Sequence, residues 1–211
     1  MTGEELHIEA IGKLAVYLEK MRIRVPGVIG KPPIAEAFAV AWKSPKTIQM
    51  KQKLYKLDKV SHIVKHSLGF LRKANHQNLE LVTEWICSFS VEALYEAMER
   101  NQAKTIALQG IENSSLYLWE ERGLPVSMVQ KARPTQEGIA VNLVFTPPNH
   151  RRKGYALSCV AAFSQALLDT GIAFCCLFAD ADNPTSNKLY QKIGYQPIAE
   201  VVVYRFTDKV I

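Results

Sequence analysis

A run of basic residues beside a glycine separates two segments of different pattern. His150-Arg151-Arg152-Lys153 is followed by Gly154, and the residues from Tyr155 onward have apolar side chains at helical spacing. The first N–H groups of a helix lack internal partners and carry partial positive charge from the helix dipole. Cationic side chains, and a glycine that lets the backbone approach a ligand closely, strengthen such a site. The turn therefore predicts a binding site for a phosphate or pyrophosphate.

The histidines and cysteines do not predict a metal site. His62 and His66 are four residues apart and can share a helical face, but no carboxylate or further histidine accompanies them. Two surface histidines are therefore favoured over a pair of metal ligands. The four cysteines form no Cys-x-x-Cys pair and lie in apolar segments, which predicts buried thiols in a reducing setting. They are Cys87, Cys159, Cys175 and Cys176.

The composition is that of an ordinary globular protein. The 211 residues are 48% hydrophobic and 22% charged, with a formal net charge of +6. This charge suits an acidic ligand but is too modest to favour nucleic acid as a partner. No apolar run approaches the roughly 18–20 residues needed to cross a membrane, and the N-terminus carries no signal-like segment. We therefore expect a cytoplasmic protein that makes no contact with membranes.

Regular elements on both sides of the turn would hold it in place. The β-rich run over 139–146 predicts a strand, which Pro147 and Pro148 end because proline cannot donate to a ladder. The unbroken apolar run over 172–180 predicts a strand buried on both faces. The elements expected after the turn are a helix over 155–169, that buried strand, a short helix from Asn183 or Pro184 to Gly194, and a strand over 196–206.

The front of the chain predicts two parts. Residues 1–45 form a helical N-terminal extension, with helices over 3–24 and 34–44 and a breaker at 25–30. Residues 46–211 form an α/β or α+β domain with a central sheet and flanking helices. Its first elements are a strand over 47–60, a loop or short helix over 61–76, a helix over 78–89, a helix capped by Ser90 and running to Gly110, and a hairpin of strands 115–121 and 124–132.

Two motifs in this order resemble the GNAT superfamily of acyl-CoA-dependent N-acetyltransferases. The pyrophosphate loop of that family is written [RQ]-x-x-G-x-[GA], and Arg151-Arg152-Lys153-Gly154-Tyr155-Ala156 fits it at every fixed position. The later pattern N-x-x-[SA]-x-x-x-Y-x-x-x-G-[FY] is also complete, in Asn183, Ser186, Tyr190, Gly194 and Tyr195. A glycine loop alone is a weak signal, but two ordered motifs, each after a strand, are a strong one. The resemblance covers about residues 113–206 and implies a mixed central sheet.

The resemblance also implies where acetyl-CoA, the expected co-substrate, would bind. In the family two central parallel strands splay apart, here 139–146 and 172–180, and the pantetheine arm lies between them. The backbone of Leu143, Val144 and Phe145 would bond the arm, and the amides of 151–156 would hold the pyrophosphate. Asn183 and Ser186 belong to the second motif, and Asn183 would bond the arm from the other side. Tyr190 would act as the general acid that protonates the departing thiolate.

Several questions stay open in the sequence. The general base is not evident: Glu137 and Asn142 are only weak candidates, and a surface or phosphate-neighbouring role is favoured for His150 over that of a base. The acceptor is expected to be an amine of a small molecule or peptide, and the acyl group is acetyl or longer. The alternative to an enzyme is a catalytically weak CoA-binding or protein-interaction module of the same fold. The sequence leaves the oligomeric state undecided, with a homodimer among the options.

Overall fold

The computed structural model describes residues 3–62, 64 and 66–207, and they form two compact units. Unit 1 comprises Met1–Leu54, Asp180–Asp182 and Ile198–Ile211, and unit 2 comprises Tyr55–Ala179 and Asn183–Pro197. Two long strands, β2 (Lys46–Leu57) and β8 (Gln196–Phe206), contribute residues to both units.

Unit 2 is built on a mixed sheet. From the end of β2 the strand order is β2-β7-β6-β5-β4-β3. The β3–β4, β4–β5 and β5–β6 pairs are antiparallel, and β6 and β7 are parallel. The strands are β3 (Phe70–Lys73), β4 (Leu116–Glu121), β5 (Leu124–Pro134), β6 (Gly138–Phe145) and β7 (Phe174–Asp180).

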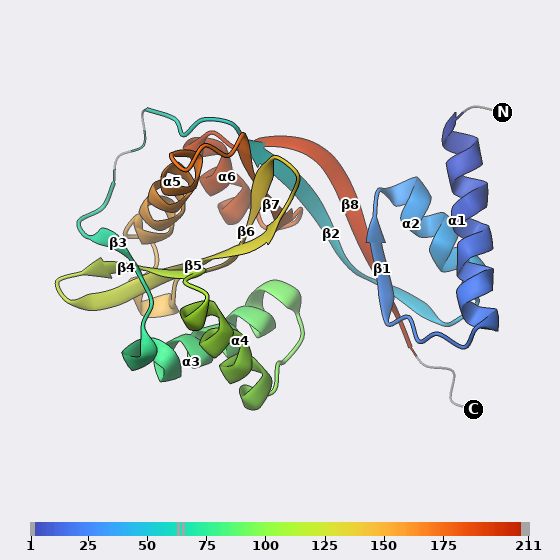
Figure 1. Ribbon diagram of the computed structural model, residues 1–211, viewed down its shortest axis with the longest axis horizontal. Coiled ribbons are helices and arrows are strands. Elements are labelled where there is room, and N and C mark those ends of the chain that lie inside the picture. The colour runs from blue at the N-terminus through green and yellow to red at the C-terminus, as the bar shows by residue number, and fades with distance from the viewer. Residues whose placement is uncertain (1–2, 63, 65, 208–211) are drawn as a thin grey trace. The chain divides into compact units, whose positions relative to one another are not determined.

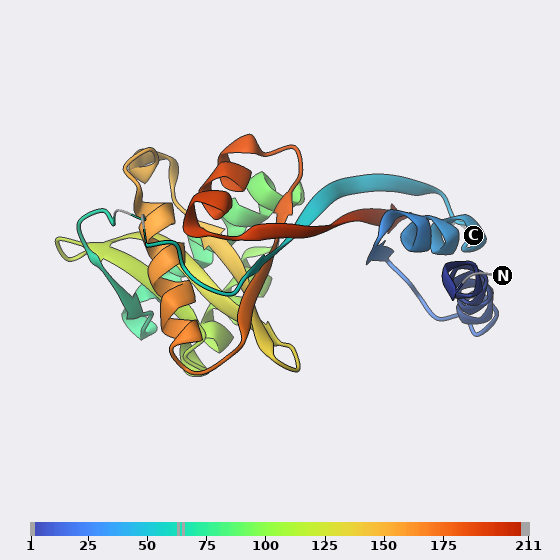
Figure 2. The ribbon, with the colours of Figure 1, turned by 90° about the horizontal axis from the view of Figure 1, so that it is seen from above.

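Helices cover both faces of this sheet (Figure 1). On one face α5 (Tyr155–Leu168) and α6 (Pro184–Ile193) pack on the larger apolar cluster, which includes Tyr55 and Phe163. Figure 2 views the unit from this side. On the other face α3 (Leu79–Leu94) and α4 (Arg100–Glu112) pack on a second cluster with Leu143 and Phe145. The 3-10 turns η1 (His76–Asn78) and η2 (Pro148–His150) precede α3 and α5.

Unit 1 is a small helical and sheet assembly. Its strands are ordered β1-β8-β2, with β1 (Gly27–Gly30) antiparallel to β8. The helices α1 (Gly3–Lys20) and α2 (Pro32–Ala41) pack on each other and on these strands. The rings of Phe38, Trp42 and Phe206 stack at centroid distances of 5.8–6.2 Å and form the centre of the core.

The structure confirms the expected α/β class and most elements, and it corrects three local interpretations. The breaker predicted at 25–30 contains the short strand β1, which pairs with β8 from the far end of the chain. The stretch 61–76, expected to be a loop or short helix, contains β3. Ser90 is not an N-cap, because α3 continues to Leu94 and the Ser90 hydroxyl donates to the Cys87 carbonyl instead. The proposed division into 1–45 and 46–211 stays a prediction.

Two buried thiols make the stability of the fold sensitive to alkaline pH. Cys159 and Cys175 are fully buried, and burial raises the pKa of each from 9.0 to about 12. A thiol whose pKa is higher in the folded state stabilises the fold at pH values below its unfolded pKa. That contribution is lost as the pH rises towards the folded pKa. We therefore expect the free energy of unfolding to fall between pH 9 and pH 12, by up to about 1.4 kcal/mol per pH unit for each thiol.

Urea unfolding at pH 7.0–9.5, below most tyrosine ionisation, measures this slope. The Cys159→Ala/Cys175→Ala variant should lose stability at neutral pH because of the space left behind, yet show a flatter dependence above pH 8.5. Cys87→Ala, in the partly buried face of α3, serves as the control. An unchanged slope in the double variant would contradict the assignment.

Candidate active site

The two central parallel strands of unit 2 separate where the resemblance predicts. β6 and β7 are paired only from Gly138–Phe174 to Ala140–Cys176, and no further pair is described between them. On the other side of β6, the register with β5 shifts between the Asn142–Gln130 and Phe145–Met128 pairs. The strand therefore leaves its ladder on both sides within a few residues.

The shift is a bulge centred on Leu143. Leu143 has φ +47, a left-handed conformation that costs a non-glycine residue about 1–2 kcal/mol. Its side chain is 7% exposed and packs in the cluster with Met128 and Phe145, which offsets that cost. Leu143 and Val144 have no Cα partner in the described register. The described pairing with β7 has already ended at Ala140, so these two residues are matched with neither neighbouring strand.

Phe145 differs from its two predecessors. It pairs with Met128, and its carbonyl accepts a hydrogen bond of 3.0 Å from the Ser127 hydroxyl. That hydroxyl also lies 2.8 Å from the Thr146 hydroxyl. Of the three residues predicted to bond the pantetheine arm, Leu143 and Val144 thus lie outside the described register, and Phe145 anchors the end of the bulge.

The start of α5 has the properties of an anion site. Gly154 is its N-cap in a left-handed conformation with φ +83, and no side chain caps the helix. Arg152 is also left-handed, with φ +62, so the turn is curled tightly before the helix begins. The first helical bond runs from the Ser158 N–H to the Gly154 carbonyl, at 3.0 Å. The N–H groups that precede it, in Tyr155 to Leu157, are the unpaired donors of a helix start.

The three basic residues of the turn have different surroundings. Arg151 donates through Nε to the Thr146 carbonyl at 2.9 Å and through its other end to the Glu92 carboxylate at 2.5 Å. Its guanidinium lies 5.8 Å from the centre of the Phe145 ring. Arg151 therefore fastens the turn to β6 and α3. Arg152 and Lys153 are exposed, and within the described chain no ion pair is found for either.

Tyr155 and Ala156 follow the glycine at the start of α5, the first with a buried side chain and the second with a partly exposed methyl group. Tyr155 is buried, and its hydroxyl donates to the Glu121 carboxylate at the β4–β5 turn. This hydrogen bond is the main reason that the pKa of Tyr155 is raised. The His150 ring packs edge-on against Tyr155, with centroids 6.3 Å apart.

The second motif places a polar helix start on unit 2. The Asn183 side-chain oxygen accepts the Ser186 N–H at 3.0 Å and so caps α6. Ser186 contributes its backbone to this cap. Asn187, one residue on, donates to the Asn183 carbonyl at 2.7 Å and accepts the Tyr55 hydroxyl at 2.7 Å.

Tyr190 is buried in a group of tyrosines but keeps its hydroxyl accessible. Its ring centroid lies 6.0 Å from that of Tyr55 and 5.9 Å from that of Tyr195, and the residue is 7% exposed. In the described structure every fully buried side-chain nitrogen or oxygen has a hydrogen-bond partner, and none is found for the Tyr190 hydroxyl. That oxygen must therefore reach solvent. Burial of the ring raises the pKa of Tyr190 well above its usual value.

Sequence reasoning missed the residues that support this tyrosine. Asn187 could have been found, because it follows Asn183 by one helical turn. Tyr55 could not, because it bonds Asn187 across 132 residues of sequence. Tyr195, a fixed position of the motif, shares a buried hydrogen bond of 2.8 Å with the Ser164 hydroxyl.

The candidates for a general base are dispersed. Glu137 and Asn142 are exposed, and Asn142 lies next to the bulge. The Glu137 carbonyl accepts the Ala173 N–H at 2.8 Å, which ties the start of β6 to β7.

No cluster of three or more potential metal ligands occurs among the described residues, and His66 stacks on Trp119 at 6.1 Å. In the same part of the chain, no helix has the length and apolarity needed to cross a membrane.

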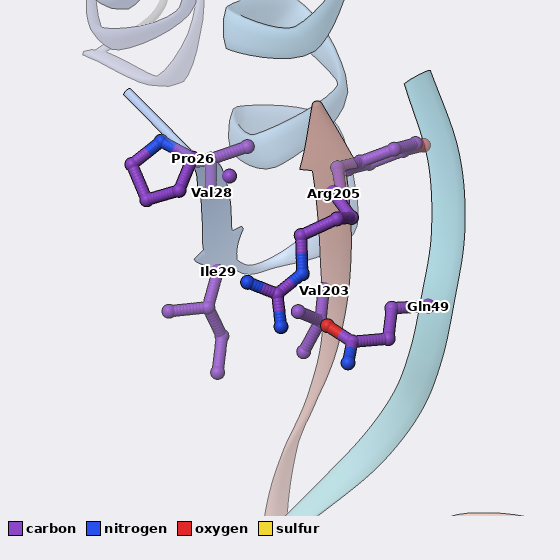
Figure 3. A pocket seen from close by; sticks show the side chains of 8 residues that line it. Pro26, Val28, Ile29, Gln49, Val203 and Arg205 are labelled. Carbon is purple, nitrogen blue, oxygen red and sulfur yellow. The ribbon is translucent and has the colours of Figure 1, made fainter. Parts of the chain in front are cut away.

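Unit 1 carries a pocket of its own. It has a volume of about 210 Å³ and lies over β1, β8 and β2. Figure 3 shows the Arg205 side chain beside Ile29, Val203 and Gln49 on this surface. None of the predicted site residues lines it.

The conformation of Gly154 predicts a selective loss of ligand binding. A Cβ there would meet nothing closer than the Ser67 Cβ at 3.8 Å, so Gly154→Ala strains the backbone without a clash. We expect about 1–2 kcal/mol of lost stability and roughly tenfold weaker binding of coenzyme A, because the turn relaxes away from its curled form. Isothermal titration calorimetry measures the affinity.

Gly171→Ala is the matched control. Gly171 follows the other end of α5 with φ +90 and open space around it, so the same backbone strain arises away from the turn. Equal coenzyme A affinity in the two variants would show that the Gly154 turn does not bind the ligand.

Comparisons with known proteins agree with the motifs. Residues 121–204 match the family model described as FR47-like protein, which is related to GNAT. No curated protein matches the chain. Similar solved structures include a GNAT-family acetyltransferase from Colwellia psychrerythraea, with a TM-score of 0.65 and 12% identity over 93% of this chain and 72% of that one.

Two further structures have a similar fold. A GCN5-related N-acetyltransferase from Kribbella flavida has a TM-score of 0.59 and 18% identity, covering 84% of this chain and 65% of that one. An N-acetyltransferase from Staphylococcus aureus Mu50 has a TM-score of 0.51 and 18% identity, covering 67% of this chain and 99% of that one. At these identities the likeness concerns the fold. The resemblance to the GNAT superfamily predicted from the two motifs is thus confirmed, in the fold of the chain and in the sequence of residues 121–204.

Proposed function

We propose that the protein is an N-acetyltransferase that moves an acetyl group from acetyl-CoA to a primary amine of a small molecule or peptide. The proposal rests on strand β6, whose described pairing with β7 ends at Ala140 and whose register with β5 shifts at Leu143–Val144, a few residues before an uncapped, cationic helix start. A free strand edge followed at short range by an anion site fits a ligand with an amide-containing arm and a pyrophosphate. Coenzyme A has both.

The backbone supplies most of the contacts in this proposal. N–H groups at the start of α5 would hold the pyrophosphate, with Arg152 and Lys153 adding charge from the exposed side of the turn. The amides of the arm would pair with the backbone of Leu143 and Val144. A backbone N–H at the bulge would also polarise the thioester carbonyl and stabilise the oxyanion that forms when the amine attacks.

Tyr190 would complete the reaction as general acid. The amine attacks the thioester carbon directly in a ternary complex, the carbon–sulfur bond breaks, and the phenol proton passes to the departing thiolate. Asn142, exposed beside the bulge, can orient an amine through its carbonyl oxygen but cannot accept its proton. The proton of the amine therefore goes to water in this scheme.

The setting that we propose is cytoplasmic. All four cysteines are free thiols, and three of them are buried, which fits a reducing compartment. The acceptor is a small amine or peptide, and neither nucleic acid nor a membrane is part of the proposal.

Calorimetry with acetyl-CoA, followed by a thiol-release assay over a panel of amines, tests the function. Binding at low micromolar concentration with amine-dependent thiol release is the expected result. Binding without release for any amine would favour the alternative, a CoA-binding or protein-interaction module. Absence of specific binding would exclude both.

Removal of the Tyr190 hydroxyl should affect turnover without affecting the fold. Tyr190→Phe keeps the ring contacts and removes a hydroxyl that has no hydrogen bond within the described structure, so the melting temperature should stay unchanged. We expect kcat to fall about 10²-fold, in the range of lost general acid catalysis, with little change in the KM for acetyl-CoA. Because the pKa of Tyr190 is raised, wild-type activity should show no alkaline loss from this group up to its ordinary pKa of 10.0.

Tyr195→Phe is the control from the same tyrosine group. It breaks the buried bond to Ser164 and should lower stability by about 1 kcal/mol while kcat is retained. If Tyr190→Phe kept the wild-type kcat, Tyr190 would not be the acid.

A further inference from the structure

α1 of unit 1 carries an apolar face that its own core does not use. Ala10, Leu14, Tyr17 and Met21 follow one another at spacings of four, three and four residues, and we call them the outer stripe. Leu14, Tyr17 and Met21 are 45%, 57% and 56% exposed. The Met21 N–H still donates to the Tyr17 carbonyl at 3.0 Å, so the stripe is helical to its end.

The core of unit 1 is already complete on another face of this helix. Ile11, Ala15 and Leu18 pack towards Phe38 and Trp42. Figure 2 looks nearly along α1 and shows α2 beside it. Single exposed apolar residues are normal on protein surfaces. A row of them at alternating spacings of three and four is the pattern of a seam between two helices.

The charges beside the outer stripe indicate which helix fits it. At 100° per residue, Glu9 and Lys20 lie on the same flank of the stripe, near its opposite ends. Arg22 and Arg24 add base after Lys20. Two copies of α1 packed antiparallel would place each acidic end against a basic end, and parallel copies would place like charges together.

The outer stripe is also self-complementary in size about a twofold axis. In an antiparallel pair centred between Ala15 and Val16, Ala10 of one copy lies opposite Met21 of the other, and Leu14 opposite Tyr17. The smallest of the four side chains, Ala10, thus meets the long Met21 side chain, while Leu14 and Tyr17 are both large. An isologous interface needs this property, because the same surface supplies both sides.

We propose that two copies of this chain associate through an antiparallel α1–α1 contact, with the outer stripes facing each other and Glu9 of each copy paired with Lys20 of the other. The helix of 18 residues is about 27 Å long, so the contact is smaller than a standard stable interface. We expect a dimer with a micromolar dissociation constant. This proposal does not depend on the proposed function.

Sedimentation equilibrium of the full chain tests the association over about 1–200 μM, a range that brackets a micromolar constant. The average mass should rise with concentration from 23.7 kDa towards twice that value. Leu14→Glu/Tyr17→Glu should stay at 23.7 kDa throughout, because it places four carboxylates in the seam. Val40→Glu, at a 62% exposed apolar position of α2, is the matched control and should still dimerise.

A charge exchange tests the antiparallel geometry. Glu9→Lys alone and Lys20→Glu alone should each weaken the dimer about tenfold, since each places two like-charged pairs across the contact. The double variant Glu9→Lys/Lys20→Glu should recover most of the wild-type affinity. Circular dichroism checks that α1 stays folded, because Glu9 also pairs with Lys13 at 2.7 Å within the helix.

Three results would overturn the proposal. One is a wild-type mass of 23.7 kDa at every concentration. Another is a double charge variant that associates less than either single variant. The third is a monomeric chain that binds anionic phosphatidylserine vesicles through Leu14 and Tyr17, which would make the outer stripe a membrane contact. Coenzyme A binding, measured on the same samples, separates these results from failure of the proposed function.

Discussion

The structure of unit 2 depends on strand β6, which stops pairing with one neighbouring strand and shifts its register against the other within a few residues. β6 stops pairing with β7 after Ala140, and it slips against β5 at Leu143. Unpaired backbone groups in the middle of a sheet are unfavourable unless something else bonds them. The left-handed Leu143 is held there by burial of its side chain between Met128 and Phe145. Core packing therefore maintains the bulge in β6.

Hydrogen bonds connect the bulge in β6 to the start of α5. The Ser127 hydroxyl bonds the Phe145 carbonyl, and Arg151 bonds the next carbonyl, that of Thr146. Arg151 also reaches Glu92 on α3. The end of β6 is thus tied to β5, to α3 and to the basic turn at once. A shift of the bulge would displace the N–H groups at the start of α5, so the position of the helix start depends on that of the bulge.

Residues close together in the sequence predicted the basic turn and the helices around it. The other features of the fold and of the candidate site depend on contacts between residues far apart in the sequence. The proline pair, the basic residues and Gly154 all act within a few residues of each other, and the structure places α5 where they indicate. The bulge has no such signal, since Leu143 lies in an uninterrupted β-rich run and its conformation depends on packing with α3. β1 is a strand only because β8 pairs with it. The three adjacent basic residues look equivalent in sequence, yet only Arg151 is fixed by neighbours.

The surroundings of Tyr190 bear on how a phenol with a raised pKa could still donate a proton. Burial raises that pKa because a phenolate among Tyr55, Tyr195 and apolar side chains is poorly solvated. A nearby cation would lower the pKa, and the groups next to Tyr190, including Asn187, are neutral. A thiolate that formed beside the same hydroxyl would be poorly solvated as well, so its own basicity would rise. The two penalties offset each other, so transfer of the proton moves the negative charge from the sulfur to the Tyr190 oxygen, and the phenolate then regains a proton from water.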